Sequence, residues 1–202
     1  MSFFENTRKP VGLGGKIMVV MMNIGHSFVA RWGLRFLKFS PDAKVLDCGC
    51  GGGANIKRLL KKCPAGIVNG IDYSAVSVEK SKKVNKKAVA KGHCEILQGS
   101  VADMIFADNR FDTVTAFETV YFWQDLPQCF REVWRVLKPG GTFFICNESS
   151  GDTDKDEKWT KIITGMTIYK DTELKAYLEQ AGFHDVQAYK NKMGWLCVTA
   201  KK

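Results

Sequence analysis

The stretch that decides the fold reads Val45-Leu46-Asp47-Cys48-Gly49-Cys50-Gly51-Gly52-Gly53. A short apolar segment runs here into glycines at alternate positions, and glycine lets a backbone turn sharply and approach a ligand that a Cβ atom would exclude. The helix expected to follow adds its N-terminal amide groups to the same loop. Asp47 narrows the choice of ligand, because a carboxylate at the end of a first strand attracts a cation and repels a pyrophosphate. The loop therefore predicts a site for an adenosine ligand that carries positive charge.

Segments with strand and helix patterns alternate on both sides of this loop. The expected strands are 44–48, 66–71, 94–98, 111–117, 142–146, 183–189 and 194–200, and the expected helices are 54–62, 75–91, 126–137 and 172–180. Repeated alternation of this kind favours one mainly parallel sheet covered by helices on both faces. The short link at 190–193 makes the last two strands an antiparallel hairpin, because a parallel crossover needs more residues.

A separate segment precedes the first strand. It carries apolar residues at helical spacing, namely Ile17, Met21, Ile24, Phe28 and Trp32. This spacing predicts one or two helices that are broken near Gly25 and pack on the domain. We expect residues 1–40 to be an amino-terminal helical arm or lid of the same domain, and residues 41–202 to form the domain itself.

Composition bounds the class of protein. The 202 residues are 45% hydrophobic and 25% charged, which suits one globular α/β domain. The apolar runs are far shorter than the roughly 20 residues of a membrane span, and the first residues do not resemble a secretory signal, so we expect a cytoplasmic protein. The seven cysteines include no C-x-x-C pair, which favours reduced thiols. The net charge of +9 comes largely from lysines in two expected helices, where a solvated face is simpler than a nucleic-acid surface.

Several motifs in order make the chain resemble the class I S-adenosylmethionine-dependent methyltransferases, in particular the type 11 methyltransferase domain group. Besides the glycine loop, these motifs are Gly70-Ile71-Asp72-Tyr73-Ser74, Phe111-Asp112-Thr113-Val114, Arg135-Val136-Leu137-Lys138-Pro139-Gly140-Gly141 and Leu178-Glu179-Gln180-Ala181-Gly182-Phe183. The resemblance implies a Rossmann-like, doubly wound sheet of seven strands in the order 3-2-1-4-5-7-6, with strand seven antiparallel. It also implies a cofactor over the carboxyl ends of strands one to three, which agrees with the switch-point rule for open α/β sheets.

The resemblance implies S-adenosyl-L-methionine as the cofactor and S-adenosyl-L-homocysteine as the product. Asp72 would hold both ribose hydroxyls, since two acceptor oxygens match a vicinal diol, and a turn or helix-cap role is the alternative. Ser100 stands where the family commonly has an acid, so either Ser100 or Asp103 would contact the adenine amino group. Gly49 and Gly51 would approach the methionine part. The complete set expected to bind the cofactor is Asp47, which would orient the charged end, with Gly49, Cys50, Gly51, Asp72, Tyr73, Ser100, Val101, Ala102 and Glu118.

Methyl transfer from a sulfonium is an in-line displacement, for which alignment and the exclusion of water matter most and a base is optional. The candidate catalytic groups are His26, Glu118 and Tyr121. The candidates for the substrate pocket are Trp123, Glu148, Trp159 and Tyr169. A capping role for His26 and simple packing of the aromatic residues are the alternatives, and no metal site is expected.

Elimination favours a small-molecule acceptor. After strand four the chain reads Phe117-Glu118-Thr119-Val120-Tyr121, which lacks the Asn/Asp-Pro-Pro-Tyr motif of nucleic-acid amine methylation. Methylation of RNA or protein remains the alternative, without a separate binding module to support it. Two other classes remain open. One is a non-catalytic S-adenosylmethionine-binding protein, and the other is an NAD-dependent oxidoreductase that would use Gly49, Gly51 and Ala54 with Asp72. The sequence does not indicate an oligomeric state.

Overall fold

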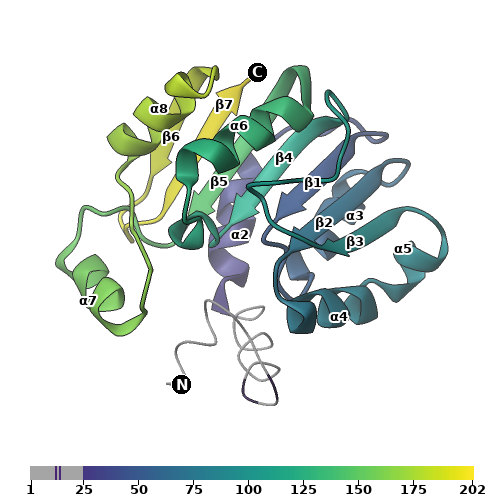
Figure 1. Ribbon diagram of the computed structural model, residues 1–202, viewed down its shortest axis with the longest axis horizontal. Coiled ribbons are helices and arrows are strands. Elements are labelled where there is room, and N and C mark those ends of the chain that lie inside the picture. Colours follow the sequence, from purple (N-terminus) through teal and green to yellow (C-terminus); the bar gives the residue numbers. More distant parts are fainter. Residues whose placement is uncertain (1–11, 13, 15–24) are drawn as a thin grey trace.

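A seven-stranded sheet forms the centre of the computed structural model, which describes residues 12, 14 and 25–202 (Figure 1). The strands are β1 (Lys44–Cys48), β2 (Ile67–Asp72), β3 (Cys94–Gln98), β4 (Phe111–Phe117), β5 (Leu137–Asn147), β6 (His184–Lys190) and β7 (Leu196–Lys201). Their order is β3-β2-β1-β4-β5-β7-β6. β7 runs antiparallel to β5 and β6, and the other pairs are parallel. The predicted fold class, strand order and final hairpin are confirmed.

Helices cover both faces of the sheet. They are α2 (Ser27–Gly33), α3 (Ala54–Lys62), α4 (Ala75–Val84), α5 (Lys86–Ala90), α6 (Leu126–Val136), α7 (Asp154–Ile162) and α8 (Asp171–Gln180), with short 3-10 turns η2 (Leu34–Phe36) and η3 (Val120–Phe122). The single helix predicted over 75–91 is wrong. It breaks at Asn85, whose side-chain amide donates to the carbonyl oxygens of Gly53 and Ser81, both at 3.0 Å. α7 was not predicted either. None of the helices in the described part of the chain combines the length and the apolar character that crossing a lipid bilayer requires.

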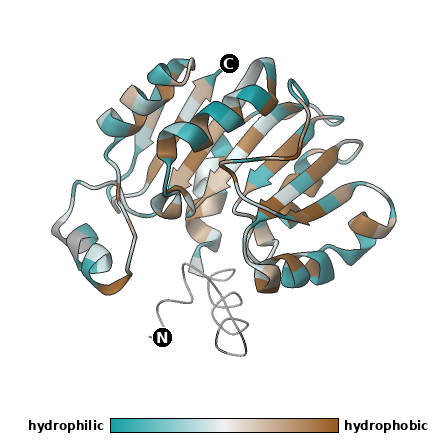
Figure 2. Ribbon diagram, in the orientation of Figure 1, coloured by the Kyte–Doolittle hydropathy of each residue, from teal (hydrophilic) through white to brown (hydrophobic). Residues whose placement is uncertain are grey.

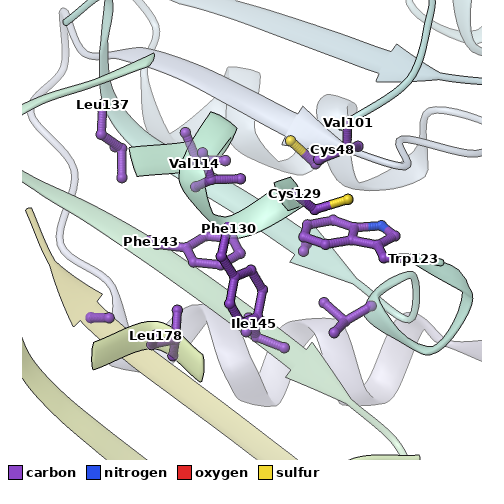
Figure 3. Close-up of a cluster of buried hydrophobic side chains, with 14 of the residues drawn as sticks. Cys48, Val101, Val114, Trp123, Cys129, Phe130, Leu137, Phe143, Ile145 and Leu178 are labelled. Carbon is purple, nitrogen blue, oxygen red and sulfur yellow. The ribbon is translucent and has the colours of Figure 1, made fainter. Parts of the chain in front are cut away.

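Two apolar cores hold these layers together. One lies between the sheet and helices α6 and α8, where Phe130 and Phe143 meet edge to face with ring centroids 5.6 Å apart (Figure 3). The other lies between the sheet and helices α2, α3 and α4. Figure 2 shows the alternation behind this arrangement, with hydrophobic residues along the central strands and hydrophilic residues on α4 and α6. Burial of each large side chain contributes about 1.5–3 kcal/mol.

Helix α2 approaches the sheet closely through a glycine. A Cβ atom on Gly33 would lie 2.6 Å from Cys146 Sγ and 2.9 Å from Cys197 Sγ, so a larger residue does not fit. Cys146 and Cys197 are cross-strand partners in β5 and β7, and all seven cysteines are buried free thiols. The buried side of α2 is Val29, Ala30 and Gly33. The predicted packing of Phe28 is therefore wrong, since 69% of its surface is exposed, while Ile17, Met21 and Ile24 lie outside the described residues.

Candidate functional site

A cleft of about 920 Å³ opens at the carboxyl ends of the central strands. In Figure 1 this is the lower end of the sheet, where α4 and α7 lie. It lies at the point where the chain switches direction, because β1 has β2 on one side and β4 on the other. Crevices at such switch points are the usual ligand sites of open α/β sheets. The volume is within the roughly 300–1,000 Å³ of small-molecule sites.

The glycine loop after β1 forms one wall of the cleft. Gly49 and Gly51 have φ values of 71° and 49°, which are left-handed conformations that favour glycine. The N–H groups of Gly49 and Cys50 donate to the carbonyl oxygen of Ile71 at 2.8 Å and 3.1 Å, which fixes the loop against β2. A Cβ atom on Gly51 would meet no atom within 4 Å, so this residue borders open space in the cleft. The loop thus offers backbone groups to a ligand without a side chain in the way.

Asp72 lies beside this loop and has a structural role of its own. Its two carboxylate oxygens accept N–H groups from Gly51 and Ser74, both at 2.9 Å. Burial raises the pKa of Asp72, and the two hydrogen bonds oppose that change. Each carboxylate oxygen has a second lone pair, and Asp72 lines the cleft. The arrangement therefore supports the turn and still leaves acceptor capacity for two ligand hydroxyls.

Asp47 does not line the cleft. Its side chain lies at the end of β1 with 1% of its surface exposed, and it accepts a hydrogen bond from Thr115 Oγ1 at 2.8 Å. Burial is the main cause that raises the pKa of Asp47 to about 7. The expected contact between Asp47 and the charged end of a ligand is thus absent from the cleft wall. Any effect of this carboxylate on a ligand acts through its field.

The loop after β3 supplies the next part of the wall. Tyr73, Ser100, Val101 and Ala102 all line the cleft, and Asp103 is not among the lining residues. Ser100 Oγ accepts the N–H of Ala102 at 3.1 Å, so it also shapes its own turn. Of the two alternatives for an adenine contact, Ser100 is the one that borders the cleft.

A polar group closes the opposite end of the cleft, where β4 and β5 finish. Glu118 follows β4 in a left-handed conformation (φ 59°), and its Oε1 accepts the N–H of Glu148. His26 Nε2 lies 3.8 Å from Glu148 Oε2. Tyr121 Oη accepts the N–H of Ser149 at 2.9 Å. All three predicted catalytic candidates, His26, Glu118 and Tyr121, are thus brought together.

Burial changes the protonation of this group. It raises the pKa of Glu118 well above the ordinary value, and the charge of Glu148 adds to the effect. Burial also raises the pKa of Glu148 and of Tyr121, and it lowers the pKa of His26. Each change favours the neutral form, so these side chains can act as hydrogen-bond partners of polar ligand groups at this end of the cleft.

Apolar side chains surround the mouth of the cleft. Of the candidates for the substrate pocket, Trp123, Trp159 and the polar Glu148 line the cleft. Tyr169 does not, because it packs against Tyr177 of α8 with ring centroids 6.2 Å apart, so the packing alternative applies there. The lining also includes residues that were not predicted, among them Ile163, Met166, Met193 and Trp195. Ile163 and Met166 follow the end of α7, and Met193 and Trp195 lie in the β6–β7 link, so no local motif indicates them.

Comparison with known proteins gives concordant matches. A family model described as a methyltransferase domain matches residues 46–145. Cycloartenol-C-24-methyltransferase 1 of Oryza sativa subsp. japonica is 35% identical over 109 residues, which are 54% of this chain and 31% of that protein. The chain thus spans about a third of that relative. Two solved structures share the fold.

One of these structures is the complex between the Haloferax volcanii Trm112 methyltransferase activator and a putative methyltransferase. It matches with a TM-score of 0.83 and 20% identity, covering 92% of this chain and 93% of that one. The other is a SAM-dependent methyltransferase from Aquifex aeolicus, with a TM-score of 0.76 and 21% identity over 92% of this chain and 97% of that one.

Proposed function

Since the chain belongs to the methyltransferase domain family, we propose that its cleft binds S-adenosyl-L-methionine and that the enzyme methylates a small molecule. The observation that carries this proposal is the joint between Gly51 and Asp72, where the N–H group donates to the carboxylate at 2.9 Å. This bond keeps the backbone of Gly51, which has no side chain, next to a carboxylate that can accept hydrogen bonds from two hydroxyl groups. A donor with a nucleoside and an amino-acid part needs both features side by side.

The residues present fit this donor. Gly51 borders open space that a Cβ atom would fill, and Asp72 lines the cleft with carboxylate oxygens that can each accept a further hydrogen bond. Tyr73 and Ser100 would flank the adenine, and Glu118 would contact the amino-acid end. The buried Asp47 beneath the loop adds a carboxyl group whose ionised form favours a cation. When bound, the donor supplies a methyl group on a positively charged sulfur.

The protein's part in the reaction is to align the acceptor and to exclude water. Trp123 Nε1 donates to Thr119 Oγ1 at 3.2 Å, which fixes the loop after β4 that faces the donor site. Tyr121 is fixed by its hydrogen bond from Ser149. Both residues hold their elements in place, so the chain presents a preformed pocket to the acceptor.

The outer part of the cleft suits an acceptor with an apolar body. Trp159, Met166, Met193 and Trp195 line this part, and the rice relative carries cycloartenol in its name. A small-molecule acceptor also agrees with the 920 Å³ volume, which can hold a donor and a second molecule. We propose further that residues 1–40 are an arm of the same domain and that the protein acts in the cytoplasm, where its seven thiols stay reduced.

Two measurements test the function. Titration calorimetry should show one S-adenosyl-L-homocysteine bound per chain and no heat with NAD. Donor carrying a labelled methyl group should then be offered to a small-molecule extract, an RNA fraction and a protein fraction. Label in the small-molecule fraction is the expected result. Label in RNA or protein would assign the other acceptor class, binding without any label would indicate a non-catalytic protein, and binding of NAD alone would contradict the proposal.

The Asp72→Ala variant tests the donor site directly. The loss of charge-assisted bonds to the ribose should weaken S-adenosyl-L-homocysteine binding by about 1.5–3 kcal/mol. Because the same carboxylate holds Gly51 and Ser74, we also expect the free energy of unfolding to fall by about 1–2 kcal/mol. Calorimetry and urea unfolding measure the two effects separately. Unchanged affinity in a folded variant would refute the assignment of Asp72.

A further inference from the structure

Three possible metal ligands meet at the acceptor end of the cleft. They are His26 just before α2, Glu118 after β4 and Glu148 after β5, and one ligand atom from each lies within 4.8 Å of the other two. The three residues are far apart in sequence, so the tertiary fold alone brings them together. All three residues line the cleft.

The donor set is that of a transition-metal site. One imidazole nitrogen and two carboxylate oxygens suit divalent first-row ions such as Zn²⁺ and Mn²⁺. Catalytic sites for such ions commonly use three protein ligands and leave a further position for water or substrate. Bonds of about 2.0–2.2 Å would require the three ligand atoms to move closer than they are, and the Glu148 side chain is 53% exposed and free to adjust.

The backbone fixes two of the three possible ligands relative to each other. The N–H of Glu148 donates to Glu118 Oε1, which ties the loop after β4 to the residue that follows β5. Glu118 holds a left-handed backbone conformation that places its side chain there. This conformation is strained for a glutamate, and backbone strain of this kind concentrates at functional sites.

We propose that His26, Glu118 and Glu148 bind one divalent first-row metal ion, Zn²⁺ or Mn²⁺, at the acceptor end of the cleft. Three protein ligands would leave the ion at least one further position for water or for an acceptor atom. The further role of this ion rests on the proposed function: it would coordinate an oxygen, nitrogen or sulfur atom of the acceptor and lower the pKa of that atom, so that the acceptor proton passes to solvent. Metal binding itself does not depend on methyl transfer.

The test uses the full chain without an affinity tag, stripped with a chelator and dialysed. Zn²⁺ and Mn²⁺ are titrated alone, with Mg²⁺ as a comparison, and binding is followed by calorimetry and, for Mn²⁺, by electron paramagnetic resonance. We expect one ion per chain. His26→Gln and Glu148→Gln should each weaken binding by more than about tenfold, since loss of even an outer-shell partner commonly costs 10–100-fold.

Matched controls exclude other sites and unfolding. His184→Gln and Glu79→Gln change the same residue types at exposed positions outside the cleft, and they should bind the metal as the unchanged protein does. Glu118 is left intact because it also belongs to the proposed donor site. Thermal unfolding confirms that each variant is folded.

Binding of S-adenosyl-L-homocysteine is measured on the same samples. Donor-product binding without metal binding would overturn the metal site and leave the proposed function standing. Metal binding that His26→Gln and Glu148→Gln do not weaken would place the ion elsewhere and also overturn the proposal. If the unchanged protein does not bind S-adenosyl-L-homocysteine, the proposed function is contradicted. A one-to-one metal complex that both His26→Gln and Glu148→Gln weaken would still support the metal site.

Discussion

Asp47 is a carboxyl group that the fold buries at the tip of β1. The usual pKa of an aspartate, which applies to the unfolded chain, is 3.8, and burial raises the pKa of Asp47 to about 7 in the folded protein. Between these values the folded protein keeps a proton that the unfolded chain releases, so the free energy of unfolding should fall as the pH rises from about 4 to about 7. The difference between the two pKa values corresponds to about 4 kcal/mol.

The Asp47→Asn variant should remove this dependence. An asparagine can still accept the hydrogen bond from Thr115, and it carries no charge to bury. We expect the variant to be more stable than the unchanged protein at pH 8 and closer to it at pH 5, as measured by urea unfolding. Because a nearby negative charge favours a cationic donor, the variant should also bind S-adenosyl-L-methionine more weakly. An identical pH dependence in both proteins would contradict the assignment.

Gly51 and Gly92 form a matched pair for testing the glycine loop. Both have positive φ values, 49° and 74°, and a Cβ atom on either would meet no atom within 4 Å. Valine at either position should therefore cost a similar backbone strain of about 1–3 kcal/mol. Only Gly51 borders the cleft, so only Gly51→Val should lose S-adenosyl-L-homocysteine affinity by more than about tenfold, or 1.4 kcal/mol. Equal affinities in the two variants would mean that Gly51 does not face the ligand.

Local turn chemistry places some of the site residues, whereas contacts between distant elements decide the position of others. The positions of Gly51 and Asp72 follow from local turn chemistry at the ends of β1 and β2, which pair in register. The depth of Asp47 does not, because it depends on the hydrogen bond from Thr115 in the neighbouring strand. Tyr169 was misplaced for the same reason, since its partner Tyr177 lies on α8 and no short-range pattern couples the two.

At the scale of elements, the docking of α2 depends on one glycine. Valine at position 33 would collide with Cys146 and Cys197, so we expect Gly33→Val to lower the free energy of unfolding by about 1–3 kcal/mol through overpacking. The near-ultraviolet circular dichroism of Trp32 should change too, because its ring lies 5.8 Å from that of Trp195.

Gly25→Val is the control for this experiment, since a Cβ atom there meets nothing within 4 Å. It should leave the signal of Trp32 unchanged. If Gly33→Val also leaves both the stability and the aromatic signal unchanged, α2 is not held at the position described.

The apolar pattern of the sequence predicted the ends of a helix or strand correctly where no contact with a distant part of the chain changed them. α3 and the strands β1, β3 and β4 begin and end at the predicted residues. The break between α4 and α5 arises because Asn85 bonds to the carbonyl of Gly53 in the glycine loop, a contact across the fold. α7 begins at a capping box in a polar segment whose sequence lacks an apolar face, so its periodicity gave no signal.

At the scale of the whole molecule, ligand binding should stabilise the entire domain. S-adenosyl-L-homocysteine at about 100 times its Kd should raise the free energy of unfolding by about 2.7 kcal/mol. For a chain of this length that corresponds to a rise in Tm of roughly 5–10 °C. Differential scanning calorimetry with and without the compound measures it, and NAD serves as the control. An unchanged Tm at saturating concentration would mean that the compound does not bind the folded state.

The topology of the sheet was predictable only in part. Alternating strand and helix patterns indicated the parallel core, and the short link before β7 indicated the final hairpin. The insertion of β7 between β5 and β6 pairs Phe143 with Ala200, and nothing local in either strand encodes that partnership. That feature came from the resemblance to a family with the same strand order.

The close contact of Gly33 in α2 with the sheet covers two thiols, and the reactivity of these thiols can report whether α2 stays in place. Cys146 and Cys197 are shielded by α2 itself, and alkylating reagents act on thiols that solvent can reach. Their rate of modification under native conditions therefore measures local opening of α2, whereas Cys50 and Cys129 line the cleft and report on access to it. Alkylation followed by mass spectrometry should thus detect opening of α2 through cysteines that the chain already carries.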